Sequence, residues 1–219
     1  MANFNLIGNS LIDLITNGEA TTENFAEKKA EILKLIKTAV RAKISLIQIR
    51  EKKLAARLVF ELAAEAVKLA QNTETKILIN DRADIALAAN ADGVHLTSCS
   101  LSADIIRRNF PDNFIIGVST HTIEEAELAK NRGADFVTFS PIFDSPDKDN
   151  PQGIEKLREV CEKLNPFSII ALGGIDATNY KSVLEAGASG FAAIRFLNDA
   201  GNIKKISRKV AKHTKNNEK

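Results

Sequence analysis

The sequence has no tryptophan and a single tyrosine among its 219 residues. Proteins that bind single-stranded nucleic acid stack bases on aromatic side chains, so this scarcity weakens that class of function. The formal net charge of +2 is too small to indicate a polyanionic partner. Much of the positive charge lies in residues 204–219. We predict that this basic stretch is a solvated, partly frayed C-terminal tail rather than a nucleic-acid arm.

Cysteine is scarce, and long apolar runs are absent. The two cysteines, Cys99 and Cys161, lie far apart without a CxxC spacing, so neither a zinc site nor a disulfide framework is predicted. No apolar run reaches the roughly 18 residues that a membrane span requires. The N-terminus lacks a basic region followed by an apolar one, so no signal peptide is predicted. We therefore expect a cytoplasmic protein that does not enter a membrane.

The apolar residues, 44% of the chain, follow an alternating rhythm. Short runs rich in β-branched residues alternate with longer stretches of helical spacing. Residues 22–42 form one helical stretch, and 122–133 and 177–187 are two others that end at a glycine, as helices often do. The eight strand-like runs are 5–16 in part, 44–50, 76–80, 92–96, 114–119, 135–140, 168–172 and 190–196.

Eight strand–helix units in a chain of this length predict an α/β fold, a single-domain (β/α)8 TIM barrel over residues 1–219. A doubly wound open sheet is the alternative, but no GxGxxG motif follows the first strand. No linker or low-complexity segment indicates a second domain. In such barrels the chemistry lies at the C-terminal ends of the strands, so the residues that follow each strand are the candidates for function.

The second strand runs directly into charge, in the stretch SLIQIREKKL. Side chains alternate along a strand. Ile47 and Ile49 are therefore expected to face the helices. Gln48, Arg50 and Lys52 then point into the barrel mouth, where an anionic ligand would compensate the two cations. A charged loop in water is the alternative.

Two further strand ends carry polar groups that have more than one interpretation. Asn80 and Asp81 follow the third strand; taken alone they favour a helix N-cap over a carboxylate that holds Mg²⁺. Ser119 ends the fifth strand and is a possible phosphate donor. His121, two residues later, is either a general acid or base or an ordinary loop histidine.

The last three strands end in features that suit a phosphate. The long polar loop 140–153 is a candidate lid, and Lys148 lies near its middle. Gly173 and Gly174 precede a predicted helix, and backbone N–H groups at such a position bind anions. Arg195 shares parity with an alanine of the eighth strand and is expected to point inward, to hold phosphate or to pair with an acid such as Asp81 of the third strand end.

Taken together, these motifs resemble the thiamine phosphate synthase/TenI family from about residue 44 to residue 197. The motifs that carry the resemblance are QIREK, LINDRADIALAANADGVHL, GVSTHTIEEAELAKNRGADFV, SPIF, and ALGGI followed by AGASGFA. Synthases of this family join a pyrimidine methyl diphosphate to a thiazole phosphate. The resemblance implies that diphosphate leaves, that a pyrimidine carbocation forms, and that the thiazole nitrogen captures it.

The resemblance also implies a role for individual residues. Asp81 would be a Mg²⁺ ligand, and Mg²⁺ would be the cofactor. Gly174 and the backbone near Ile194 would bind the thiazole phosphate. The pyrimidine diphosphate would be bound by Gln48, Arg50, Lys52, Asn80, Ser119 and Lys148.

The chain departs from the family pattern in three places. Ser100 occupies the position of the second metal-binding aspartate, and a hydroxyl is a poor substitute for a carboxylate on a hard cation. Ser145 and Asp147 replace two threonines of the lid. Arg195 replaces a serine that binds phosphate, so it is a candidate substrate-binding residue in a changed pocket.

These departures leave two alternatives to the synthase. The TenI branch has the same barrel but catalyses a metal-independent aromatisation of a thiazole phosphate, with a histidine at the position of His121 as acid and base. A non-catalytic binder of thiamine precursors is the third reading. The partners expected are phosphorylated pyrimidine and thiazole substrates, with no nucleic acid and no membrane; the sequence leaves open whether the chain forms a homo-oligomer.

Overall fold

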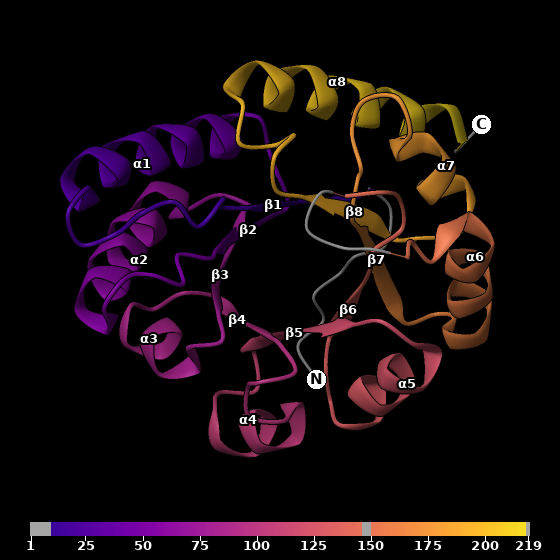
Figure 1. Ribbon diagram of the computed structural model, residues 1–219, viewed down its shortest axis with the longest axis horizontal. Helices are drawn as coiled ribbons and strands as arrows, with labels where there is room; N and C mark the ends of the chain where they lie inside the picture. Colours follow the sequence, from indigo (N-terminus) through magenta and orange to yellow (C-terminus); the bar gives the residue numbers. More distant parts are fainter. Residues whose placement is uncertain (1–9, 146–149, 218–219) are drawn as a thin grey trace.

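The computed structural model describes residues 10–145 and 150–217, with side chains up to residue 210. Eight parallel strands hydrogen-bond in chain order and close into a barrel, because β1 pairs with both β2 and β8. Each strand is followed by a helix, and the helices surround the barrel (Figure 1). The predicted (β/α)8 barrel is confirmed. Within these ranges no helix combines the length and the apolar character needed to cross a bilayer.

The observed strands overlap all eight predicted runs. The last strand is shorter than predicted, because it ends at Ala193 rather than at residue 196. The strands are β1 Leu11–Ile15, β2 Leu46–Ile49, β3 Lys76–Asn80, β4 Gly93–Leu96, β5 Ile115–Thr120, β6 Phe136–Phe139, β7 Ser168–Leu172 and β8 Gly190–Ala193. The helices are α1 Phe25–Arg41, α2 Ala56–Ala70, α3 Ala83–Ala88, α4 Ala103–Asn109, α5 Ile123–Asn131, α6 Gly153–Leu164, α7 Tyr180–Glu185 and α8 Ala200–Asn217.

Alternation along the strands separates two apolar layers. Between strands and helices, residues such as Ile47 and Ile49 pack against the buried faces of helices such as α1. Inside the barrel, a smaller apolar cluster lies below the polar C-terminal ends of the strands. It consists of Leu11, Ile15, Leu46, Leu78, Ile115, Phe136, Ile170 and Ala192. Helix α8 includes residues 204–217 of the basic stretch, and its residues Ile203, Ile206 and Val210 are buried; fraying at its end stays a prediction.

One pleat further toward the C-terminal ends, the barrel interior becomes polar. Gln48 follows Leu46 on this side of β2, and Asn80 follows Leu78 on β3. His95 follows a glycine on β4, where it is only 2% exposed. This polar layer forms the floor of the barrel mouth, and it places the predicted site residues of β2 and β3 side by side.

One polar side chain lies among the apolar residues instead. Asp13 of β1 is fully buried, and neither of its carboxylate oxygens has a hydrogen-bond partner within the described residues. Its neighbours in the sheet are Leu46 of β2 and Ala192 of β8. Burial raises the pKa of Asp13 from 3.8 to about 7. The side chain therefore holds its proton in moderately acidic solution.

Candidate active site

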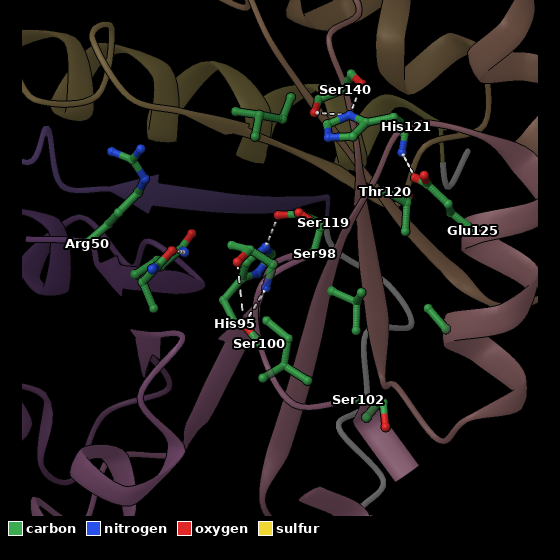
Figure 2. Close-up of a pocket in the computed structure, with 18 of the residues that line it drawn as sticks. Arg50, His95, Ser98, Ser100, Ser102, Ser119, Thr120, His121, Glu125 and Ser140 are labelled. Atoms are coloured by element: carbon green, nitrogen blue, oxygen red, sulfur yellow. Dashed lines mark hydrogen bonds between the residues drawn. The ribbon is translucent and has the colours of Figure 1, made fainter. Parts of the chain in front are cut away.

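A cavity of about 450 Å³ occupies the barrel mouth, and Figure 2 shows the side chains around it. The predicted residues that it brings together are Gln48, Arg50, Lys52, Asn80, Ser119 and His121. They come from the ends of β2, β3 and β5, in agreement with the rule that barrel enzymes place their chemistry at this face.

The side chains of the charged stretch after β2 point in alternating directions, as predicted. Arg50 and Lys52 line the cavity. Glu51, between them, points the other way and is only 4% exposed. Its carboxylate accepts hydrogen bonds from the backbone N–H of Ala20 at 2.9 Å and of Gly18 at 3.3 Å, which ties the loop after β1 to the end of β2. The charged residues that follow the apolar run thus direct two cations into the mouth and one anion into the framework.

A chain of amides connects the barrel floor to a carboxylate. Gln48 donates through Nε2 to Oδ1 of Asn80 at 3.0 Å, and Asn80 donates through Nδ2 to Oδ2 of Asp81 at 2.6 Å. Oε1 of Gln48 is buried and has no partner within the described residues. An acceptor left free beside a cavity is available to a donor group on a ligand, because an unpaired buried oxygen is otherwise costly.

Asp81 is held by the loop that follows β4. Its Oδ1 accepts hydrogen bonds from the hydroxyl of Thr97 at 2.7 Å, from the backbone N–H of Thr97 at 3.2 Å and from the hydroxyl of Ser100. Burial opposes ionisation of this carboxyl, but the bonds from Ser100 and Thr97 and the charge of Lys52 outweigh it and lower the pKa of Asp81. Asp81 is therefore an ionised group with a fixed orientation.

The N-cap prediction for Asp81 is wrong. The residue before helix α3 is Arg82, and it makes no side-chain capping bond. Asp81 itself has a left-handed backbone with φ of 61° and directs its oxygens to Thr97, Ser100 and Asn80. The physical reason is that the long loop after β4 offers three donors to this carboxylate, which a sequence pattern around Asp81 does not reveal.

Asp81 is the one carboxylate that this part of the site offers to a cation. The described residues contain no group of three or more His, Cys, Asp or Glu side chains placed to hold a metal ion. Ser100, at the position of the second expected ligand, donates to Asp81. Mg²⁺ often binds through one or two carboxylates together with water and substrate phosphates. The donor set therefore fits a Mg²⁺ ion only if substrate and water provide most of its ligands.

Ser119 lies beside a histidine that the sequence analysis did not single out. Oγ of Ser119 is 3.0 Å from Nε2 of His95 (Figure 2). Burial lowers the pKa of His95 to about 4, against an opposing effect of the charge of Asp81, so the ring is neutral. The strand parity that places Asn80 inside the barrel also places His95 there, and this signal was available in the sequence.

His121 stands at the rim of the same cavity. Its Nδ1 is 2.7 Å from the carbonyl oxygen of Ser140, so Nδ1 carries the proton and donates (Figure 2). The backbone N–H of His121 donates to the carboxylate of Glu125 at 2.6 Å. In the neutral ring Nε2 is then the basic nitrogen, which suits a proton acceptor.

A second cavity of about 450 Å³ adjoins the first across Leu172 and Ile194, which line both. Its lining includes Ser145, Gly174 and Arg195. Gly174 has a φ of 64°, and a Cβ on it would lie 2.5 Å from the carbonyl oxygen of Asp144, so only glycine fits. Helix α7 begins at Tyr180, six residues after Gly174 and three residues later than the predicted start at residue 177.

The prediction that Arg195 points inward assumed that Ala193 faces the barrel interior, and this assumption is wrong. Ala192 and Ile194 belong to the barrel interior, whereas Ala193 packs against the helices. Arg195 follows the end of β8, is exposed, and lines the second cavity. Asp81 is bonded to other residues, so the suggested pair between it and Arg195 is not formed. Because the strand ends at Ala193, strand parity does not extend to this arginine.

The predicted lid lies partly outside the described residues. Asp147 and Lys148 fall in the segment 146–149, for which no structure is described. Ser145, just before that segment, lines the second cavity. The closing of Lys148 over a bound diphosphate stays a prediction.

The comparisons with known proteins agree with the fold and with the family resemblance. A family model described as thiamine monophosphate synthase matches residues 14–197. A protein of Aquifex aeolicus, provisionally named thiamine-phosphate synthase 2, is 42% identical over 182 residues, covering 82% of this chain and 93% of that protein. The thiamine-phosphate synthase of Caldicellulosiruptor bescii is 37% identical over 188 residues, covering 84% and 85%. The solved structure of a thiamine phosphate pyrophosphorylase from Pyrococcus furiosus superposes with a TM-score of 0.81 at 27% identity, covering 96% and 99%.

Proposed function

We propose that this chain, which belongs to the thiamine monophosphate synthase family, condenses hydroxymethylpyrimidine diphosphate with hydroxyethylthiazole phosphate to thiamine phosphate and diphosphate. The observation that carries the proposal is the convergence of Arg50 and Lys52 with the amide chain of Gln48 and Asn80 in one cavity. A diphosphate requires the cations, and a nitrogen heterocycle with an amino group requires the amide acceptor.

In this reaction the bond between the pyrimidine methylene carbon and the diphosphate oxygen breaks, and the electron pair leaves with the diphosphate. Arg50 and Lys52 stabilise the negative charge that grows on the leaving group, and the hydroxyl of Ser119 donates to one of its oxygens. The free oxygen of Gln48 accepts from the pyrimidine amino group. The thiazole nitrogen then bonds to the methylene carbon.

Asp81 is the residue that would hold Mg²⁺. The ion would neutralise charge on the diphosphate oxygens when it is bound. Hydrogen bonds from Thr97 and Ser100, which themselves line the cavity, keep the carboxylate ionised and fix its orientation. Since Ser100 provides no second carboxylate, the ion's affinity in the absence of diphosphate is expected to be low.

The second cavity is the site that we assign to the thiazole phosphate. It combines the backbone of Gly174 with the guanidinium of Arg195, and its lining meets that of the first cavity at Leu172 and Ile194. Two anionic substrates could therefore bind side by side with their reacting ends at the shared wall. Lys148 of the lid is the proposed further contact to the diphosphate.

The test is turnover with the purified protein, both substrates and Mg²⁺. Product would be oxidised to thiochrome and followed by fluorescence, beside a known synthase as the positive control. Thiochrome above the no-enzyme background supports the proposal. Background only, while the control synthase works, would overturn it. Binding of either precursor without turnover would then indicate a non-catalytic binder.

His121 supports a second candidate function, the aromatisation of a thiazole phosphate tautomer. Its Nδ1 is fixed on the carbonyl of Ser140, which leaves Nε2 as a base at the cavity rim. This activity would proceed in the presence of a chelator and would be lost in His121→Ala. Aromatisation that persists in His121→Ala would exclude this role for the histidine.

A further inference from the structure

The hydroxyl of Ser119 has a buried neighbour that determines where its proton points. His95 is 2% exposed and lies on β4, next to β5, with Nε2 at 3.0 Å from Oγ of Ser119 (Figure 2). The same Nε2 is 3.4 Å from the hydroxyl of Thr138, a longer contact. On the other side of the ring, Nδ1 has no partner within the described residues.

The space for this ring is built into the neighbouring strands. A Cβ on Gly117 would lie 2.8 Å from Nδ1 of His95 and 2.3 Å from the ring of Phe136. The rings of His95 and Phe136 are 5.8 Å apart, centroid to centroid, and tilted by 47°. Glycine and phenylalanine thus hold the imidazole with Nε2 toward Ser119, and they offer no acceptor to Nδ1.

The missing partner of Nδ1 decides the tautomer. A neutral imidazole carries one N–H. If that N–H were on Nδ1, a donor would be buried without an acceptor, which native structures rarely tolerate. With the proton on Nε2, the ring donates to Oγ of Ser119, and the hydroxyl hydrogen of Ser119 must point elsewhere. The cavity is the place where Ser119 can find an acceptor.

We propose that His95 is a positioning residue, which donates from Nε2 to the Ser119 hydroxyl and thereby aims the hydroxyl hydrogen at an oxygen of the leaving diphosphate. The inference rests on the proposed function for the identity of that ligand. His95 itself touches no substrate in this arrangement; it acts through Ser119. In the reverse role, Ser119 would donate its proton to the ring and present only lone pairs to an anion, and the ring would carry a buried Nδ1–H without an acceptor among the described residues.

The experiment compares His95→Met, His95→Gln, Ser119→Ala and the double variant His95→Met with Ser119→Ala. Methionine removes the donor, whereas the glutamine amide replaces it near the position of Nε2. We expect His95→Met to lower kcat about 10-fold, the size of one well-placed hydrogen bond, with little change in the KM for the thiazole phosphate. His95→Gln should recover most of this loss. On the Ser119→Ala background, His95→Met should cost less than about 2-fold.

Two results would overturn the inference. One is a loss for His95→Met that is as large without the Ser119 hydroxyl as with it, because the histidine would then act independently of Ser119. The other is a His95→Gln variant that is as impaired as His95→Met. Restoring a donor would then not restore activity, as expected if the histidine has only a structural role. Thermal melting of each variant would establish that the compared proteins are folded.

A readout without turnover separates this inference from the proposed function. Binding of inorganic diphosphate, measured by calorimetry, should weaken in His95→Met and in Ser119→Ala without a further loss in the double variant. If His95→Met does not fold, the wild type still decides, because nitrogen-15 spectra of its three histidines report the tautomer of each ring. The Nε2–H form of His95 is expected, and the Nδ1–H form would contradict the proposal.

Discussion

The two sides of the barrel mouth hold their polar groups in different ways. At the ends of β2–β5, side chains bond to one another, so that Gln48, Asn80 and Asp81 form one connected chain. At the ends of β7 and β8, the cavity is lined by glycine backbone, by the exposed Arg195 and by Asp176, which accepts two hydrogen bonds from Thr178. The first side fixes its groups before a ligand arrives, and the second leaves its cationic side chain, Arg195, exposed to solvent. Pre-organisation belongs where charge develops in the reaction.

The largest expected effect is at Lys52, on the connected side. Lys52→Ala removes a cation that faces both the cavity and Asp81. We expect kcat/KM in the thiochrome assay to fall about 100-fold, as for the loss of one group that stabilises developing charge. Lys53→Ala is the matched control, since Lys53 is an exposed lysine that does not line the cavity. Equal losses in the two variants would mean that net charge, not position, is what matters.

The next largest effect should come from giving the connected side its second carboxylate. In Ser100→Asp the new side chain replaces the hydroxyl that donates to Asp81. Two carboxylates bind Mg²⁺ better than one, so the Mg²⁺ concentration for half-maximal rate should fall about 10-fold. Without Mg²⁺ the variant should melt at a lower temperature than the wild type, because like charges repel.

Cys99→Asp adds the same charge to the same loop at an exposed position that does not line the cavity, and it serves as the control. It should change neither the Mg²⁺ dependence nor the melting temperature to a comparable extent. An unchanged Mg²⁺ dependence in Ser100→Asp would show that substrate oxygens already compensate for the missing ligand.

A smaller effect is expected at Arg195, on the backbone side. Arg195→Ser should raise the KM for the thiazole phosphate about 5-fold and leave kcat nearly unchanged, because the arginine is exposed and its pairing with an anion is screened by water. Lys181→Ser removes one charge from the nearby helix α7 without touching the cavity and should have no effect. A fall in kcat for Arg195→Ser would place this arginine in the chemistry rather than in binding.

The same contrast explains how much could be predicted from the sequence. Strand alternation predicted that Gln48 and Arg50 face the mouth, because Ile47 and Ile49 pack toward the helices. Lys52 lies three residues beyond the end of β2 and also lines the cavity, as predicted. The hydrogen bonds that hold Asp81 could not be predicted, since its partners Thr97 and Ser100 lie on another loop.

On the backbone side, the prediction for Arg195 began from the wrong residue. Ala193 packs against the helices, whereas Ala192 and Ile194 face the barrel interior, so parity with Ala193 does not direct Arg195 inward. Loop geometry there depends on contacts such as that between Gly174 and Asp144, which link segments about thirty residues apart. The position of His95 was predictable, because the parity that places its sheet neighbour Asn80 inside the barrel also places His95 there.

The smallest effect on turnover is expected at Asp13, on β1, the strand between β2 and β8. Its carboxyl has a pKa of about 7 in the fold against an ordinary value of 3.8, so between about pH 4 and pH 7 the folded state holds a proton that the unfolded chain has lost. Stability is therefore greatest below pH 4 as far as Asp13 is concerned, and it falls as pH rises to 7, by at most about 1.4 kcal/mol per pH unit.

Asp13→Asn keeps the shape and cannot ionise, so this slope should disappear, and the variant should gain on the wild type with rising pH up to about pH 7. Urea unfolding at pH 5, 6, 7 and 8 would measure the difference. Because Asp13 lines neither cavity, kcat and both KM values should stay within about 2-fold of the wild type. A constant difference in stability across this range would show that the buried carboxyl finds a partner that keeps its pKa low. A large loss of kcat would show instead that the two sides of the mouth are positioned through β1.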